Sequence, residues 1–242
     1  MMPNPALSAT SHAVSHVGCR RHRNEDRWLA RDDHGLWAVA DGMGGLMAGD
    51  AAAQAVVDAL VELPAGLGHG ALVQAITAVI AATSATIARR AAAAGGLSGT
   101  TLAALLSREG RASLIWCGDS RIYRWRGGRL EQLSCDHNGA QALVEQGLIS
   151  AEAARHHPGR HDLWKAIGLP GRDSADVAET DVQPGDRYLV CTDGLHGELA
   201  DAHIGQILHR PRVDACDQLL LRTLDAGGRD NVSFVLVDFA AA

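Results

Sequence analysis

The sequence predicts an α+β protein in which antiparallel sheets are flanked by helices. Strand-forming and helix-forming segments come in blocks along the chain, rather than in the regular alternation that builds a doubly wound parallel sheet. The segment from Thr100 to Leu133 has the pattern of an antiparallel meander, with Gly127 and Gly128 as a two-residue hairpin turn. No internal repeat or linker divides the chain, so a single domain is expected.

Two helices are expected before the meander. Apolar residues recur at helical spacing from Met47 to Leu63, where Pro64 follows, and again from Ala71 to Ala88. The second segment is uncharged, as membrane spans are, but its large apolar residues fall on one side and Arg89 and Arg90 end it. We therefore expect a core helix that pairs with the first helix over a sheet.

The second half of the chain is predicted to return to strands over Asp186 to Thr192 and Val232 to Phe239, with a helix near Cys216 to Leu224. Between these segments and the meander, residues 135–168 are irregular and polar. Two short helical patterns lie within them. Such an insert is expected to form a mobile flap over the site.

Residues 1–12 contain two prolines and lack the apolar stretch of a secretory signal, so a short disordered lead-in is expected there. The predicted domain then covers residues 13–242. With 242 residues and 47% hydrophobic content, the chain is long enough for one sizeable core. The net charge of -6 argues against nucleic acid as the main partner.

The cysteines indicate a reducing compartment. They are odd in number, widely spaced, mostly within apolar strands, and form no Cys-x-x-Cys pair. We expect reduced core residues in a cytoplasmic protein. The five are Cys19, Cys117, Cys135, Cys191 and Cys216.

Carboxylates stand at the ends of several predicted strands. Asp41 ends the apolar run 36–40, and Gly42, Gly44 and Gly45 then let the backbone come close to a ligand. The other acidic residues beside predicted strands are Glu25, Asp26, Asp119, Asp193 and Asp230. Gathered carboxylates repel one another unless cations neutralise them, so the pattern predicts a shared cation site.

Six short motifs lie along the chain, and most of them contain these carboxylates. Taken in order, the motifs resemble those of the metal-dependent protein phosphatases of the type 2C serine/threonine class. Each motif is weak alone, but six in the family's order across nearly the whole chain make a strong signal. The resemblance implies a four-layer α-β-β-α sandwich with metals held at one end between two central antiparallel sheets. The motifs are Arg21 with Asn24-Glu25-Asp26, Asp41-Gly42-x-Gly44-Gly45, Ser98-Gly99-Thr100-Thr101, Gly118-Asp119-Ser120-Arg121, Cys191-Thr192-Asp193-Gly194 and Arg229-Asp230-Asn231.

The resemblance also implies a binuclear site for Mn²⁺ or Mg²⁺, and oxygen donors suit these hard cations. A hydroxide bridging the two ions would attack the phosphoryl group in line. By resemblance, Asp41 bridges both ions and the carbonyl of Gly42 holds one of them, while Asp193 and Asp230 complete the other. Glu25 and Asp26 bind directly or through waters and orient the nucleophile.

Two positions leave their roles open. Met43 stands where many eukaryotic relatives carry a histidine thought to protonate the leaving group, and a thioether cannot donate a proton. Metal-bound water or another residue, such as His196, must then do so, although a histidine in a loop is more often a surface or packing residue. Asp119 either binds a third, weaker ion, as in bacterial relatives, or holds the turn at Ser120 and Arg121.

Arginine and histidine residues give two further hypotheses. Arg21 lies where the family places the arginine that grips the substrate phosphate, and its forked guanidinium suits that role. The alternative is a solvated basic run, because Arg20 and Arg23 flank it. The histidines of the flap resemble a metal cluster only in density and are interpreted as flap surface: His156, His157 and His161.

The resemblance implies a cytoplasmic, monomeric protein serine/threonine phosphatase. Its partners would be phosphorylated proteins and a cognate Ser/Thr kinase system, with no nucleic acid and no membrane. A hydrolase of small phosphoesters and a catalytically inactive phosphoprotein-binding module are the alternatives. Intact Asp41, Asp193 and Asp230 disfavour the inactive module. Only the flap, which suits an extended protein substrate, speaks against the small phosphoester.

Overall fold

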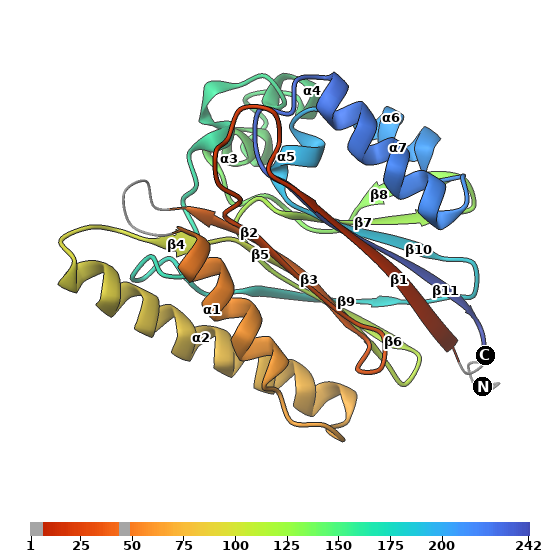
Figure 1. Cartoon of the computed structure of the whole chain (residues 1–242), viewed down its shortest axis with the longest axis horizontal. Coiled ribbons are helices and arrows are strands. Elements are labelled where there is room, and N and C mark those ends of the chain that lie inside the picture. Colours follow the sequence, from red (N-terminus) through yellow and green to blue (C-terminus); the bar gives the residue numbers. More distant parts are fainter. Residues whose placement is uncertain (1–6, 44–48) are drawn as a thin grey trace.

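The computed structural model describes residues 7–43 and 49–242, and it places two antiparallel sheets face to face between outer layers of helices (Figure 1). One sheet has five strands in the order β1-β11-β10-β7-β8. The other has six strands, in the order β2-β3-β5-β6-β9, with β4 paired to β3. The predicted α-β-β-α sandwich is therefore confirmed.

The five-stranded sheet consists of β1 (Leu7–His16), β7 (Arg121–Arg126), β8 (Arg129–Gln132), β10 (Arg187–Cys191) and β11 (Val232–Ala241). The six-stranded sheet consists of β2 (Asp26–Arg31), β3 (Leu36–Met43), β4 (Gly99–Thr100), β5 (Leu102–Arg108), β6 (Arg111–Cys117) and β9 (Asp176–Asp181). Between the sheets, Phe239 receives Trp37 and Tyr188 edge-on, at centroid distances of 5.8 and 5.6 Å. The Trp37 contact joins the two sheets, whereas Tyr188 and Phe239 lie on neighbouring strands of the five-stranded sheet.

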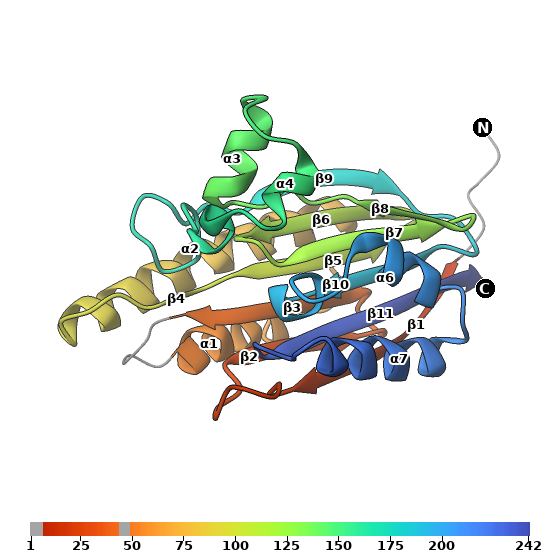
Figure 2. The same ribbon diagram turned by 90° about the horizontal axis from the view of Figure 1, so that it is seen from above.

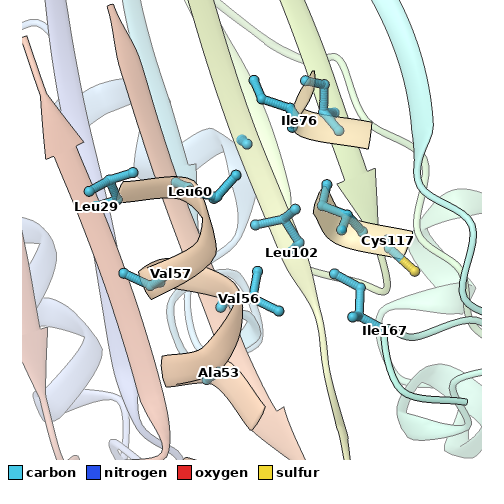
Figure 3. Packing of buried hydrophobic residues seen from close by; sticks show 14 of the residues in the cluster. Leu29, Ala53, Val56, Val57, Leu60, Ile76, Leu102, Cys117 and Ile167 are labelled. Carbon is cyan, nitrogen blue, oxygen red and sulfur yellow. The ribbon is translucent and has the colours of Figure 1, made fainter. Parts of the chain in front are cut away.

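Two helices cover the six-stranded sheet. They are α1 (Gly49–Val61) and α2 (His69–Ala93). Figure 3 shows Val56 and Leu60 of α1 and Ile76 of α2 around Leu102 of the sheet. By length and composition α2 would also pass as a membrane span, but its large apolar side chains are buried in this core, as expected of a core helix. Met47, where the first helix was expected to begin, lies outside the described residues.

Other helices cover the five-stranded sheet or form the flap. The first group is α5 (Asp193–His196), α6 (Asp201–Ile207) and α7 (Arg212–Asp225). The flap contains α3 (Gly139–Glu145), α4 (Ala151–Ala154) and the short 3₁₀ helix η1 (Pro158–His161), and Figure 2 shows α3 projecting from the sandwich.

The expectation of a disordered lead-in over residues 1–12 is wrong for residues 7–12, which form the first part of β1. β1 pairs with β11 along its whole length, from Leu7 opposite Ala241 to His16 opposite Val232. This pairing gives hydrogen-bond partners to the backbone groups on that edge of β11, which would otherwise be left exposed. Residues 1–6 lie outside the described residues.

The predicted meander from Thr100 to Leu133 is also wrong, because β5 and β6 belong to one sheet and β7 and β8 to the other. The chain crosses between the sheets at residues 118–120. Gly118 has φ +104°, and a Cβ there would lie 2.6 Å from Cγ2 of Thr101, so the crossing requires glycine. The hairpin turn at residues 127–128 is confirmed, with both glycines at positive φ.

The flap is anchored at its base by polar contacts between the buried side chains of Lys165 and His137 and the partly exposed Asp176. Lys165, which is the only lysine in the sequence, forms an ion pair with Asp176. His137 donates from Nε2 to the same carboxylate at 3.1 Å, and its Nδ1 accepts from the Gly118 amide at 3.0 Å. The base of the flap is thereby tied to the crossing between the sheets.

Candidate metal centre

Five aspartates that are distant in the sequence come together at one end of the sandwich. Asp26 begins β2 and pairs in register with Asp41 near the end of β3. Asp119 lies in the crossing after β6, Asp193 begins α5 after β10, and Asp230 precedes β11. The other four carboxylates lie close enough for their charges to raise the pKa of Asp41.

Burial and mutual repulsion oppose ionisation of this cluster. Burial, with the charges of Asp193 and Asp230 adding to it, raises the pKa of Asp26 to about 7. The pKa values of Asp41 and Asp119 are raised well above the ordinary value, first by burial and then by neighbouring carboxylates. Bound cations would therefore favour the ionised form of these carboxylates.

The donor atoms fit hard divalent ions. Oδ1 of Asp26 and Oδ1 of Asp193 are buried without a hydrogen-bond partner, a costly arrangement that a cation would relieve. Gly42 packs so closely on Gly49 that a Cβ would lie 2.2 Å from the Gly49 carbonyl oxygen, so no larger residue fits there. Gly44 and Gly45 lie outside the described residues.

The carboxylates do not form a closed ligand shell. Across residues 7–43 and 49–242, no three His, Cys, Asp or Glu side chains are grouped tightly enough to enclose an ion by themselves. Mg²⁺ is normally held by one or two carboxylates and keeps several waters. The arrangement therefore suits hydrated ions held by a few carboxylates and a backbone carbonyl.

Hydroxyl groups fix the backbone that carries Asp41. Oγ1 of Thr101 accepts from the Asp41 amide at 3.0 Å and hydrogen-bonds to Oγ of Ser120 at 2.6 Å. Oγ1 of Thr100 donates to the Asp41 carbonyl at 3.0 Å. The motif at residues 98–101 therefore links the end of β3 to the crossing that carries Asp119.

Asn231 joins the loop before β2 to the start of β11. Its Oδ1 accepts from the amide of Glu25 at 2.8 Å, and its Nδ2 donates to the carbonyls of Val17 and Arg23, each at 2.9 Å. Glu25 is thereby held near Asp230, the neighbour of Asn231. Asn231 belongs to one of the sequence motifs, but its positioning role follows only from these long-range contacts.

Arg21 lies at the entrance of the centre. Its Nη2 donates to Oδ2 of Asp230 at 2.6 Å, and its side chain remains half exposed. Arg23, two residues on, instead pairs with Asp50 of α1 at 3.0 Å. The structure therefore separates Arg21 from the basic run around it.

His196 is buried, which agrees with the packing role that was one of its expected alternatives. Its Nε2 lies 3.0 Å from the carbonyl oxygen of Asp119. Burial, followed by the charge of Arg121, lowers the pKa of His196 well below its ordinary value, so the ring is neutral and donates to that carbonyl. This bond occupies the ring proton and positions Asp119.

The flap reaches the centre through His161. Its Nδ1 lies 4.0 Å from Oδ2 of Asp193, although its side chain is 61% exposed. The interpretation of the three flap histidines as surface residues therefore holds for His156 and is incomplete for His161. His157 precedes η1 and caps it by accepting from the Gly159 amide. A cavity of about 300 Å³ between the flap, α5 and α6 includes both Asp119 and Asp193 in its lining.

The two stacked sheets and the carboxylates at one end define a class of proteins with an acidic, cation-binding site between the sheets. Residues 14–232 match the family model for protein phosphatase 2C. This chain belongs to the protein phosphatase 2C family. The resemblance found in the sequence is thereby confirmed.

Curated relatives carry phosphatase names. The chain is 37% identical over 230 residues to the serine/threonine protein phosphatase PstP of Mycobacterium tuberculosis, covering 93% of this chain and 44% of PstP. It is 31% identical over 229 residues to the serine/threonine phosphatase stp of Listeria monocytogenes, covering 90% and 91% of the two chains. The chain thus spans less than half the length of PstP and nearly all of stp.

Solved structures agree with the fold. PppA, described as a key regulatory component of T6SS in Pseudomonas aeruginosa, superimposes with a TM-score of 0.89 at 34% identity, covering 97% of this chain and 100% of PppA. The PstP catalytic domain in complex with two manganese ions has a TM-score of 0.87 at 34% identity, with the same coverage of both chains.

Asp41→Asn is expected to raise the melting temperature of the metal-free protein at neutral pH. Because the pKa of Asp41 is raised by burial and then by Asp26, the folded state binds more protons than the unfolded chain between the ordinary aspartate pKa and the raised one. Stability therefore falls as the pH rises through this window. Asparagine is neutral throughout and avoids the loss.

Thermal unfolding in chelator, from about pH 4 to pH 8, measures this effect. The variant should exceed the wild type at neutral pH, the gap should close toward pH 4, and Mn²⁺ should then stabilise the wild type more than the variant. Asp225→Asn, at an exposed position on α7, is the matched control. A wild-type melting temperature at or above that of the Asp41 variant in chelator at neutral pH would contradict the repulsion.

Proposed function

We propose that this chain hydrolyses phosphoserine and phosphothreonine in proteins at a binuclear Mn²⁺ or Mg²⁺ centre. The observation that carries the proposal is the buried carboxylate cluster, in which one oxygen of Asp26 and one of Asp193 lack any partner. Family membership and the phosphatase names of the relatives support the same activity.

Each site residue has a proposed role. Asp41, Asp193 and Asp230 hold the two ions together with the carbonyl of Gly42. Bound there, the ions supply an activated water and neutralise charge on the transferring phosphoryl group. Asp26, fixed by a 2.9 Å hydrogen bond from Thr192, orients that water on the sheet side. Glu25 does so from the loop held by Asn231.

Arg21 is proposed to bind the phosphoryl oxygens. Its Nη2 is engaged with Asp230, and the exposed remainder of the guanidinium can face a substrate entering the site. A planar fork binds two phosphoryl oxygens at once, which an ammonium group cannot do. Arg21 thus joins the substrate to a carboxylate of the centre.

The proposed setting is a cytoplasmic, monomeric enzyme that opposes a Ser/Thr kinase in a bacterial signalling or secretion system, without nucleic-acid or membrane partners. PppA, a solved relative of similar length, is described as a regulatory component of a secretion system. A small phosphoester remains the alternative substrate. The flap beside the centre favours an extended protein substrate.

We expect activity to depend fully on added metal. Phosphate release from a phosphothreonine peptide should require Mn²⁺ or Mg²⁺ and stop in excess chelator, because the ions are held by carboxylates and water without soft ligands. Asp193→Asn and Asp230→Asn should each lower kcat by about a hundredfold or more. Full activity in excess chelator would refute the binuclear proposal.

Asp119 is proposed to hold a third, weaker ion. Asp119→Ala should lower activity on protein substrates while the two central ions remain bound, because His196 and Ser120 still hold the backbone of the crossing. Calorimetric titration with Mn²⁺ at millimolar concentration measures the number of ions. The same stoichiometry in variant and wild type would leave Asp119 with a structural role only.

Arg21→Ala is expected to lower kcat/KM by a factor that corresponds to a loss of about 2 to 4 kcal/mol in transition-state stabilisation. This is the range for a charge-assisted bidentate contact and its geometric role. Arg21→Lys should recover part of the loss, because the charge is kept and the fork is lost. Steady-state kinetics on a phosphothreonine peptide separate KM from kcat. Arg20→Ala and Arg23→Ala are the controls, and equal damage from either would assign the effect to the basic run.

A further inference from the structure

A second groove lies beside the metal centre, on the side of the flap that faces the start of α6. Its volume is about 520 Å³. We call it the flap groove. The side chains that give it a cationic character are Arg155, Arg160 and Arg229, and His156, His157 and His203 also line it.

The arginines of the flap groove differ in their hydrogen-bond and ion-pair partners. Arg155 is held in its floor, where it donates to the carbonyl of Leu199 at 3.1 Å and lies 3.5 Å from Asp201. Arg160 donates to the carbonyl of Arg155 at 2.6 Å and to Nε2 of His161 at 2.9 Å. Within the described residues Arg160 has no carboxylate partner, so its charge remains available to a ligand.

Arg229 also lines the flap groove. Its Nε and Nη2 each donate to Glu198 at 2.8 Å. Glu198 is nearly buried, with 4% of its side chain exposed, whereas 65% of the Arg229 side chain is exposed. The carboxylate is thus covered, and the outer edge of the guanidinium faces solvent. The other carboxylate of the groove, Glu152, is exposed.

The flap groove is continuous with the metal centre. His161, which hydrogen-bonds to Arg160, lies 4.0 Å from a carboxylate oxygen of Asp193. Arg160 lines both the cavity that contains Asp193 and the flap groove that contains Arg229. In an extended peptide, alternate side chains point to the same side at roughly 7 Å intervals. A peptide with its phosphorylated residue at the centre therefore presents a nearby side chain to the groove.

We propose that the flap groove recognises an anionic side chain of the phosphoprotein substrate, a carboxylate or a second phosphoryl group, close in sequence to the residue that is hydrolysed. The proposal rests on the function proposed above and adds a substrate class to it. Guanidinium groups bind both anions through paired N–H donors. Arg160 and Arg229 supply these donors in the lining of the groove.

Phosphothreonine peptides that differ at a single position test the proposal. The series carries Ala, Glu, Lys or phosphoserine at successive positions on each side of the phosphothreonine, and chromatography follows loss of the phosphothreonine in Mn²⁺. Glu should raise kcat/KM and Lys should lower it by about three- to fivefold relative to Ala, the size expected of an exposed ion pair. The effect should be confined to positions on one side, and it should weaken with salt.

The groove is tested by removing its cations. Arg160→Gln and Arg229→Gln should each bring the Glu-to-Ala ratio of kcat/KM close to one, and Arg160→Glu should make Lys the preferred residue. Arg90→Gln, which removes an exposed arginine at the end of α2, should leave the ratio unchanged. Arg229→Gln leaves Glu198 buried without its partner, so Arg160→Gln decides the outcome if the Arg229 variant does not fold.

The outcomes separate this inference from the proposed function. Failure of the wild type to hydrolyse any peptide in Mn²⁺ would overturn both. Hydrolysis of the Ala peptide, with the same kcat/KM for Ala, Glu, Lys and phosphoserine at every position, would overturn the inference alone. A Glu preference that persists in both Arg160→Gln and Arg229→Gln would place anion recognition elsewhere and equally overturn it.

Discussion

Repulsion between buried carboxylates is the constraint on which this structure depends. The backbone around Asp26, Asp41 and Asp193 is held by hydroxyl and amide groups that carry no charge. The carboxylates therefore stay close together although their charges repel one another. Thr101 shows how this is achieved, because one hydroxyl contacts both the end of β3 and the crossing between the sheets. The rigid sheets thus offset an unfavourable interaction that divalent cations convert into a binding site.

Much of the fold and the candidate site could be predicted because the aspartates coincide with strand ends. A buried strand followed by Asp and Gly is a local pattern, and Asp41 and Asp193 are recognisable from a few residues each. β1 was missed because its small, mixed side chains form a strand only when β11 supplies the partner. The crossing at Gly118 was misread as part of a meander, since alternating strand patterns do not reveal which sheet each strand joins.

The residues that were not predicted act through contacts distant in the sequence. Asn231 holds a loop more than two hundred residues away, and the proximity of His161 to Asp193 depends on how the flap folds back. Neither contact leaves a periodic signal in the sequence. Arg160 and Arg229 were likewise separate features of the chain, and only the fold places them along one groove.

The base of the flap has a consequence for covalent chemistry. Lys165 is the only lysine of the chain, and its ammonium group is buried against Asp176. Reagents and enzymes that acylate lysine therefore find no exposed target on the folded molecule. Acylation of Lys165 would occur only when the base of the flap opens, so its rate would report that opening directly at a single, known position.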